Sequence, residues 1–165
     1  MKILRVIIIV ILVLMAVPRE VWAKDYGYIY FYSIDEYGES SEKYYEVSID
    51  DFTTANEKAE FLIEKLILNE NNDITYIPKY TSLLWVKIYE NVCVINLSKE
   101  GFFSGGRYSE DRYVNQLLKT VWSLEEIDSI ILYIEGKYSN LSGGVDFSAY
   151  SRDSNVLLEG SGVID

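Results

Sequence analysis

The sequence predicts an α+β fold: a small mixed β-sheet with two amphipathic helices packed on one face, preceded by an N-terminal β-hairpin. Three observations predict it. Segment 26–33 has a tyrosine at every second position, two segments that begin near Thr54 and Ser109 repeat apolar residues with the helical period, and runs 92–97 and 130–134 are almost wholly apolar. Such runs are typical of strands that are covered on both faces. A sheet that buries one face against two helices forms this class of fold.

The first residues are predicted to be an export signal rather than part of the folded domain. Two basic residues precede an apolar run of about 12 residues at 6–17, and cleavage is expected between Ala23 and Lys24, so that the signal is 1–23. A retained amino-terminal anchor is the alternative, although the run is shorter than the roughly 20 residues that span a bilayer. We expect an exported, extracytoplasmic protein that meets a membrane only through this segment.

The rest of the chain is expected to comprise a hairpin at 24–52, a sheet-and-helix domain at 53–150 and a tail at 151–165. The full chain carries a net charge of −11, and the predicted leader holds three basic residues and one acidic residue. The remainder therefore carries −13. A field of that sign repels nucleic acid, so we expect no nucleic-acid partner.

Two alternating segments predict the hairpin. Over 26–33 the tyrosines occupy one face and smaller or apolar residues occupy the other, which indicates a strand. The polar stretch 35–43 is expected to form a loose connection, and 44–49 returns as the second strand.

Thr54 and Glu57 form a capping-box pattern that predicts the start of the first helix, because each side chain can satisfy a free backbone N–H of the other. The polar segment 69–73 has turn chemistry, so this helix is expected to end near Leu68. Apolar residues fall on one helical stripe: Ala55, Ala59, Leu62, Ile63 and Leu66.

The sheet and the second helix follow. A strand is expected to present Leu84, Val86 and Ile88 on one face, and a tight reversal at 90–91 leads into the apolar strand 92–97.

The second helix is expected to begin near Ser109, with Glu110 and Asp111 in its first turn, where negative charge meets the positive end of the helix dipole. Segment 130–134 is another buried strand, and 145–165 is expected to hold an edge strand and a tail. The wide apolar stripe of the helix comprises Tyr113, Val114, Leu117, Leu118, Val121 and Trp122.

A series of short motifs extends from the first helix to the last apolar strand: Ile77-Pro78, Thr81, Leu83-Leu84, Asn96-Leu97-Ser98, Gln116-Leu117, Thr120 and Ile134-Glu135-Gly136-Lys137. Their order and spacing resemble the GerMN domain family of sporulation and spore-germination proteins, over roughly 100 residues when the helix from Thr54 is included. The resemblance implies a fold like the ring-building motifs of sporulation assembly proteins. It also implies a role in sporulation or germination.

The residues offer little for catalysis or metal binding. The chain has no histidine, which removes the commonest general base and most transition-metal ligand sets. Its single cysteine, Cys93, lies in an apolar run and is expected to be a buried, inert thiol. Adjacent carboxylates at 35–36, 50–51 and 125–126 point in different directions, and the acidic segment 69–73 lacks the glycine and closing glutamate of a calcium loop. We predict no catalytic, cofactor-binding or metal-binding residues.

The chain contains 15 tyrosines, and many lie between positions 26 and 45. They can cover a sheet face beneath a helix or loop. They can also form a partner-binding surface, because tyrosine is enriched among the residues that dominate binding energy at interfaces. The hypothesis is that the face bearing Tyr28, Tyr30 and Tyr32 is exposed and docks a protein.

With the resemblance, the leading hypothesis is an exported, non-enzymatic binding or assembly module of the bacterial cell envelope, linked to sporulation or spore germination. Its expected partner is an envelope or sporulation-complex protein, and assembly into a homo-oligomer is left open. The alternative is an extracytoplasmic domain that binds a small cationic or wall-derived ligand in a tyrosine-lined pocket. A third hypothesis is a secreted hydrolase in which two carboxylates face each other across a cleft.

Overall fold

A computed structural model describes residues 25–153 and confirms the α+β prediction. The hairpin strands come first, followed by two helices and four strands that build the main sheet, with a short 3-10 turn and a further small strand pair. In chain order the elements are β1 (Tyr26–Ile34), β2 (Ser40–Ser48), α2 (Ala55–Leu68), β3 (Leu83–Tyr89), β4 (Val92–Leu97), η2 (Lys99–Gly101), α3 (Arg107–Val121), β5 (Ser129–Ile134), β6 (Ser139–Asn140), β7 (Asp146–Phe147) and β8 (Ala149–Ser151).

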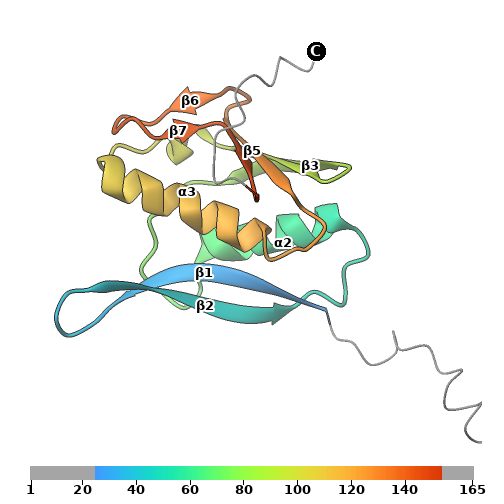
Figure 1. Cartoon of the computed structure of the whole chain (residues 1–165), viewed down its shortest axis with the longest axis horizontal. Coiled ribbons are helices and arrows are strands. Elements are labelled where there is room, and N and C mark those ends of the chain that lie inside the picture. The colour runs from blue at the N-terminus through green and yellow to red at the C-terminus, as the bar shows by residue number, and fades with distance from the viewer. Residues whose placement is uncertain (1–24, 154–165) are drawn as a thin grey trace, which may run out of the picture.

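The main sheet is mixed and has the strand order β3-β4-β5-β8. β4 pairs with β3 in antiparallel and with β5 in parallel orientation, and α3 forms the crossover between the two parallel strands. β1 and β2 form a separate antiparallel pair. Figure 1 shows both helices between the main sheet and this hairpin, so each helix is covered on two sides.

One apolar core joins these layers. The hairpin contributes Ile29 and Phe31, α2 contributes Leu62 and Leu66, and the central strand β4 contributes Ile95, all of them buried. The close approach of β1 to α2 requires a glycine, because a Cβ added at Gly27 would lie 2.8 Å from the side chain of Leu62. The hairpin is therefore packed into the same core as the helices and the sheet.

The structure corrects three details of the sequence prediction. β2 begins at Ser40, so the connection expected over 35–43 is a short turn, in which the Asp35 carboxylate accepts hydrogen bonds from nearby backbone N–H groups. A register irregularity between Leu83 and Trp85 turns Leu84 outward, where it is 46% exposed, and Leu83 packs against the core instead.

The third correction concerns the second helix, α3, which begins at Arg107 rather than near Ser109. Gly106 precedes it with a φ of 78°, a backbone conformation that favours glycine. The backbone can therefore enter the helix two residues before the start that Glu110 and Asp111 predict.

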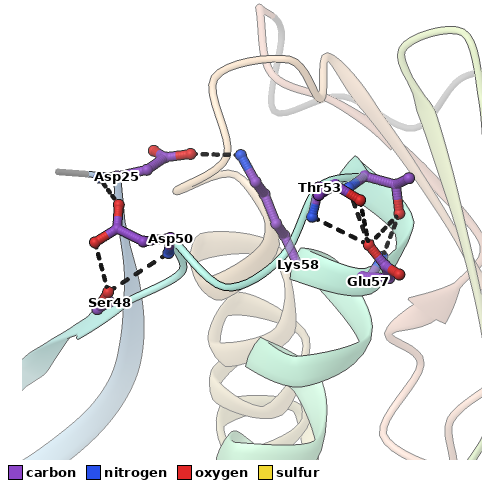
Figure 2. Close-up of polar contacts among 7 residues, drawn as sticks. Asp25, Ser48, Asp50, Thr53, Glu57 and Lys58 are labelled. Atoms are coloured by element: carbon purple, nitrogen blue, oxygen red, sulfur yellow. Dashed lines mark hydrogen bonds and ion pairs between the residues drawn. The ribbon is translucent and has the colours of Figure 1, made fainter. Parts of the chain in front are cut away.

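A polar network joins the base of the hairpin to the start of α2 (Figure 2). The Asp50 carboxylate accepts hydrogen bonds from the Asp25 N–H at 2.6 Å and from the Ser48 hydroxyl at 2.9 Å. Lys58, in the first turns of α2, forms an ion pair with the Asp25 carboxylate. The network fixes the point at which β1 begins relative to α2.

The predicted capping box is confirmed. The Thr54 hydroxyl accepts a hydrogen bond from the Glu57 N–H at 3.2 Å, and the Glu57 carboxylate accepts one from the Thr54 N–H at 3.0 Å. The hydrogen bonds that its carboxylate accepts, first that from the Thr54 N–H, lower the pKa of Glu57. The helix ends at Leu68, as expected, with Asn69 in the left-handed conformation behind it.

The predicted leader 1–23, its cleavage between Ala23 and Lys24, and the end of the expected tail lie outside the described residues. Within residues 25–153, no helix has the length and apolar character needed to cross a membrane.

We predict that Thr54→Ala lowers the free energy of unfolding by about 1 kcal/mol, because α2 loses its N-cap acceptor. The control is Thr53→Ala, whose hydroxyl contacts the Glu57 carboxylate without accepting a helix N–H. Urea denaturation measures both. The effect of Thr54→Ala should shrink as pH falls through the lowered pKa of Glu57, because a protonated Glu57 no longer completes the box. Equal destabilisation by both variants would contradict this account.

Candidate interaction surface

A polar stripe on α3 and the turn behind it lies along the outer edge of β1. Gln116, Thr120 and Ser123 follow one another at helical spacing, so they project from the same side. Ser123 Oγ accepts the N–H of Tyr28 at 3.0 Å, and Thr120 Oγ1 accepts the N–H of Tyr30 at 3.1 Å. Gln116 Nε2 donates to the carbonyl oxygen of Tyr30 at 3.0 Å. Side chains of α3 thus occupy the place of a neighbouring strand.

Gln116 links β1 to a second segment. Its Oε1 accepts the N–H of Tyr76 at 2.6 Å and the hydroxyl of Thr75 at 3.3 Å. One residue earlier in the chain, the Ile74 carbonyl accepts the Tyr32 N–H at 3.0 Å and continues the closure of the β1 edge. Gln116 is only 1% exposed, so the loss of its amide would leave buried polar groups without partners.

This edge contact fixes the face of the hairpin on which tyrosines gather. Tyr28 and Tyr30 are half-buried, and Tyr44 of β2 is 59% exposed between them. The ring centroids of Tyr28 and Tyr44 lie 5.5 Å apart, and those of Tyr30 and Tyr44 lie 5.6 Å apart. We call Tyr28, Tyr30 and Tyr44 the tyrosine face.

The prediction that Tyr32 belongs to an exposed face is wrong. Its side chain is only 2% exposed. The ring packs edge-on against Tyr76 with centroids 5.1 Å apart, and the Arg112 guanidinium of α3 lies 4.6 Å from its centroid. The two-residue period of the strand places Tyr32 with the other tyrosines. However, α3 and the segment around Tyr76 cover this end of the strand.

Two hollows flank the tyrosine face on the side of α3. The larger has a volume of about 480 Å³, and the smaller, of about 300 Å³, shares Ser123 with it. Tyr30, Glu42, Tyr44, Lys119, Trp122 and Ser123 line the larger hollow. Asp25, Tyr26, Tyr28, Ser123, Leu124, Glu125 and Glu126 line the smaller. We call these two neighbouring hollows the groove; their linings combine aromatic and acidic side chains.

Charges at the groove are mainly negative. Lys119 and Glu42 form an ion pair at 2.5 Å, with side chains 40% and 43% exposed. Because solvent screens this pair, it contributes about 0–1 kcal/mol to stability. The negative charge of Glu46 raises the pKa of Tyr28. Burial raises the pKa of Tyr30, and the charge of Glu42 adds to the effect. These phenols therefore remain neutral at physiological pH and can donate hydrogen bonds.

Three of the residues considered for chemistry are buried or take part in structural hydrogen bonds. Cys93 is buried as expected, and burial raises the pKa of its thiol to about 12. Asp35 accepts backbone hydrogen bonds in the hairpin turn, and Asp50 lies in the network at the hairpin base. Within residues 25–153, no group of three or more histidine, cysteine, aspartate or glutamate side chains is placed to hold a metal ion.

Glu110 has a structural role that its sequence position does not reveal. The charge pattern explains its place in the first turn of α3, but its side chain is 0% exposed. Its carboxylate accepts hydrogen bonds from the Gly143 N–H at 2.6 Å and the Ser142 hydroxyl at 3.1 Å. A Cβ at Gly143 would lie 2.4 Å from the backbone nitrogen of Arg107. Gly143 therefore lets a loop close on the start of α3.

The chain matches one protein family over most of its length. The family model Germane, described as sporulation and spore germination, matches residues 28–140. The chain belongs to the Germane family. The match covers the hairpin from Tyr28, both helices and the strands β3 to β5, and it confirms the GerMN resemblance. Gln116 and Thr120, two of the motif residues, are among those that close the edge of β1.

Two solved structures share the fold of this Germane protein. One is of a Clostridium perfringens protein classed as a lipoprotein, with a TM-score of 0.54, 20% identity, and coverage of 79% of this chain and 89% of that chain. The other holds the tandem GerMN domains of the sporulation protein GerM from Bacillus subtilis, with a TM-score of 0.55 and 16% identity. The match covers 81% of this chain and 47% of the GerM chain. No curated protein matches the chain.

We predict that Gln116→Leu lowers the free energy of unfolding by about 2–3 kcal/mol, because the Tyr30 carbonyl and the Tyr76 N–H lose their partner. Urea denaturation measures the change. Asn115→Leu is the matched control: Asn115 precedes Gln116 on α3 but is exposed, and its replacement should change stability by less than about 0.5 kcal/mol. A Gln116→Leu protein as stable as the control would show that the edge contact contributes little.

Proposed function

We propose that this Germane protein is an exported, non-enzymatic binding or assembly module of the bacterial cell envelope, which acts in sporulation or spore germination. The observation that carries the proposal is the tyrosine face. It places an exposed Tyr44 between two half-buried tyrosines, on a hairpin that is fixed to α3 by buried side chains. Rigid aromatic residues of this kind supply contact area at little entropic cost.

Export is supported by two observations. The amino-terminal sequence has the basic start and the apolar run of a secretory signal. A protein with the same fold, from Clostridium perfringens, is classed as a lipoprotein. The family itself is described by sporulation and spore germination, which supports a role in a spore-forming cell.

A binding role fits the chemistry of the described residues better than catalysis. Two of the carboxylates that line the groove form ion pairs: Asp25 with Lys58 and Glu42 with Lys119. The one thiol is buried and has a raised pKa. The groove offers neutral phenols, an indole and acidic margins, which suit a partner that presents apolar and basic side chains.

A second candidate function is the binding of a small cationic ligand. The larger hollow favours it, because its volume of about 480 Å³ lies in the range of ligand sites and its lining joins Tyr30, Tyr44 and Trp122 to Glu42. The exposed position of Tyr44, at 59%, leaves the hollow open on one side and favours a protein surface.

We predict that Tyr44→Ser reduces capture of the partner at least about tenfold, because it removes the central ring of the tyrosine face. The tagged exported domain would be used for affinity capture from sporulating cells, with captured proteins quantified by mass spectrometry. Tyr89→Ser is the matched control: Tyr89 is 56% exposed, close to the 59% of Tyr44, but lies on β3 in the main sheet.

Three results would contradict the proposal. The first is that no envelope protein is enriched, and the second is that the Tyr44 and Tyr89 variants capture equally. The third is hydrolysis of wall-derived sugars or peptides by the purified domain. The second candidate would be favoured by a different pair of results. A small polyamine would bind in calorimetric titration, with binding abolished by Tyr44→Ser, and no protein would be captured.

A further inference from the structure

The outer edge of β2 is open in the part of the chain that the structure describes. The pair β1-β2 forms a sheet of its own, and no backbone group of another described segment bonds to β2 on its far side. Figure 1 shows β2 at the margin of the molecule, with the helices on the other side of β1. β2 runs for nine residues, which is long for an unprotected edge.

The register identifies the backbone groups on this edge. The N–H groups of Tyr28 and Tyr30 point away from β2, toward α3, so the alternate residues of β1 bond to β2. In an antiparallel ladder, bonded and non-bonded residue pairs alternate. The non-bonded pairs are Tyr28–Glu46, Tyr30–Tyr44 and Tyr32–Glu42. Hence Glu42, Tyr44 and Glu46 direct their N–H and carbonyl groups outward.

The side chains of the same three residues all lie on the side of the hairpin that carries the tyrosine face, and all three are exposed. A strand added in antiparallel orientation would pair its residues with Glu42, Tyr44 and Glu46. The paired side chains would point to that same side. Backbone pairing and side-chain contact with the tyrosine face are therefore available to one ligand at once.

Charge indicates what this edge accepts. The hairpin from Asp25 to Ser48 carries six acidic residues and one lysine, a net charge of −5. The lysine, Lys43, forms an ion pair with Asp73 at 2.9 Å. A second copy paired about Tyr44 would set Glu42 of one chain opposite Glu46 of the other, and like charges in that position destabilise a sheet. The edge therefore disfavours self-pairing and favours a basic strand.

We propose that the edge of β2 accepts an extended basic segment of the partner protein as an added antiparallel strand, with lysine or arginine side chains opposite Glu42 and Glu46. This inference rests on the proposed binding function and specifies the form of the partner. Main-chain hydrogen bonds would supply affinity, as in other cases of strand addition. The acidic side chains and the ring of Tyr44 would select basic residues on alternate positions.

The test uses a nine-residue synthetic peptide of alternating lysine and valine, matched in length to β2. Two variants carry backbone N-methyl groups, either on every lysine or on every valine. A lysine opposite Glu42 or Glu46 must donate its own N–H to β2, whereas the valine N–H groups point away. We predict that lysine N-methylation weakens binding at least about tenfold and that valine N-methylation leaves it nearly unchanged.

Variants of the full-length protein complete the test. Glu46→Pro removes an outward N–H without removing a bond to β1, and Glu46→Gln removes the charge alone. Thermal unfolding is recorded for both variants, and peptide binding is measured by calorimetric titration. The proline variant should bind the lysine–valine peptide at least about tenfold more weakly than the glutamine variant. If the proline variant does not fold, the binding of the two methylated peptides to the native protein tests the proposal instead.

Several results would overturn the inference. Equal binding of both methylated peptides would show that charge alone attracts them, and absence of binding would show that the edge accepts no strand. A dimer of the free protein that Glu46→Pro dissociates, detected by light scattering, would assign the edge to a second copy. If capture of the partner is lost with Tyr44→Ser but retained with Glu46→Pro, the added-strand proposal is refuted while the proposed function stands.

Discussion

The structure depends on one contact: the side chains of α3 take the place of a strand beside β1. A two-stranded hairpin has two open edges, and each edge exposes unpaired N–H and carbonyl groups. Ser123 and Thr120 accept the N–H groups of Tyr28 and Tyr30, and Gln116 donates to the Tyr30 carbonyl. The hairpin is thereby joined to the helix layer by hydrogen bonds as well as by its buried Ile29 and Phe31. Its orientation relative to the helices follows from this contact.

The same contact gives the molecule its asymmetry. One edge of the hairpin is closed by a helix, and the other, along β2, is open. The tyrosine face lies between these edges, with a groove toward α3 and acidic residues toward β2. A surface of this kind holds fixed aromatic rings beside free backbone groups, which suits recognition of an extended segment. The binding role that we propose for this Germane protein is an outcome of how its hairpin is held.

Much of the fold could be predicted because it rests on local patterns. The capping box of Thr54 and Glu57 and the apolar run 92–97 specify their elements without reference to distant residues. The burial of Tyr32 could not be predicted in this way, because Tyr76 and Arg112 cover it from elsewhere in the chain. Gln116 and Thr120 were recognised as motif residues, but their part in the fold emerges only when α3 lies beside β1. Their helical spacing places them on one side of α3 but does not reveal that their partners lie on a strand far away in the sequence.

Amide hydrogen exchange of the native protein, followed by NMR, tests the central contact most directly. The outward N–H groups of Tyr28, Tyr30 and Tyr32 on β1 are bonded to Ser123 behind α3, to Thr120 of α3 and to Ile74. Those of Glu42, Tyr44 and Glu46 on β2 face solvent. We predict that the three amides on β1 exchange at least about a hundredfold more slowly than the three on β2. Exchange at similar rates on both edges would contradict the account, because the helix would then not close β1.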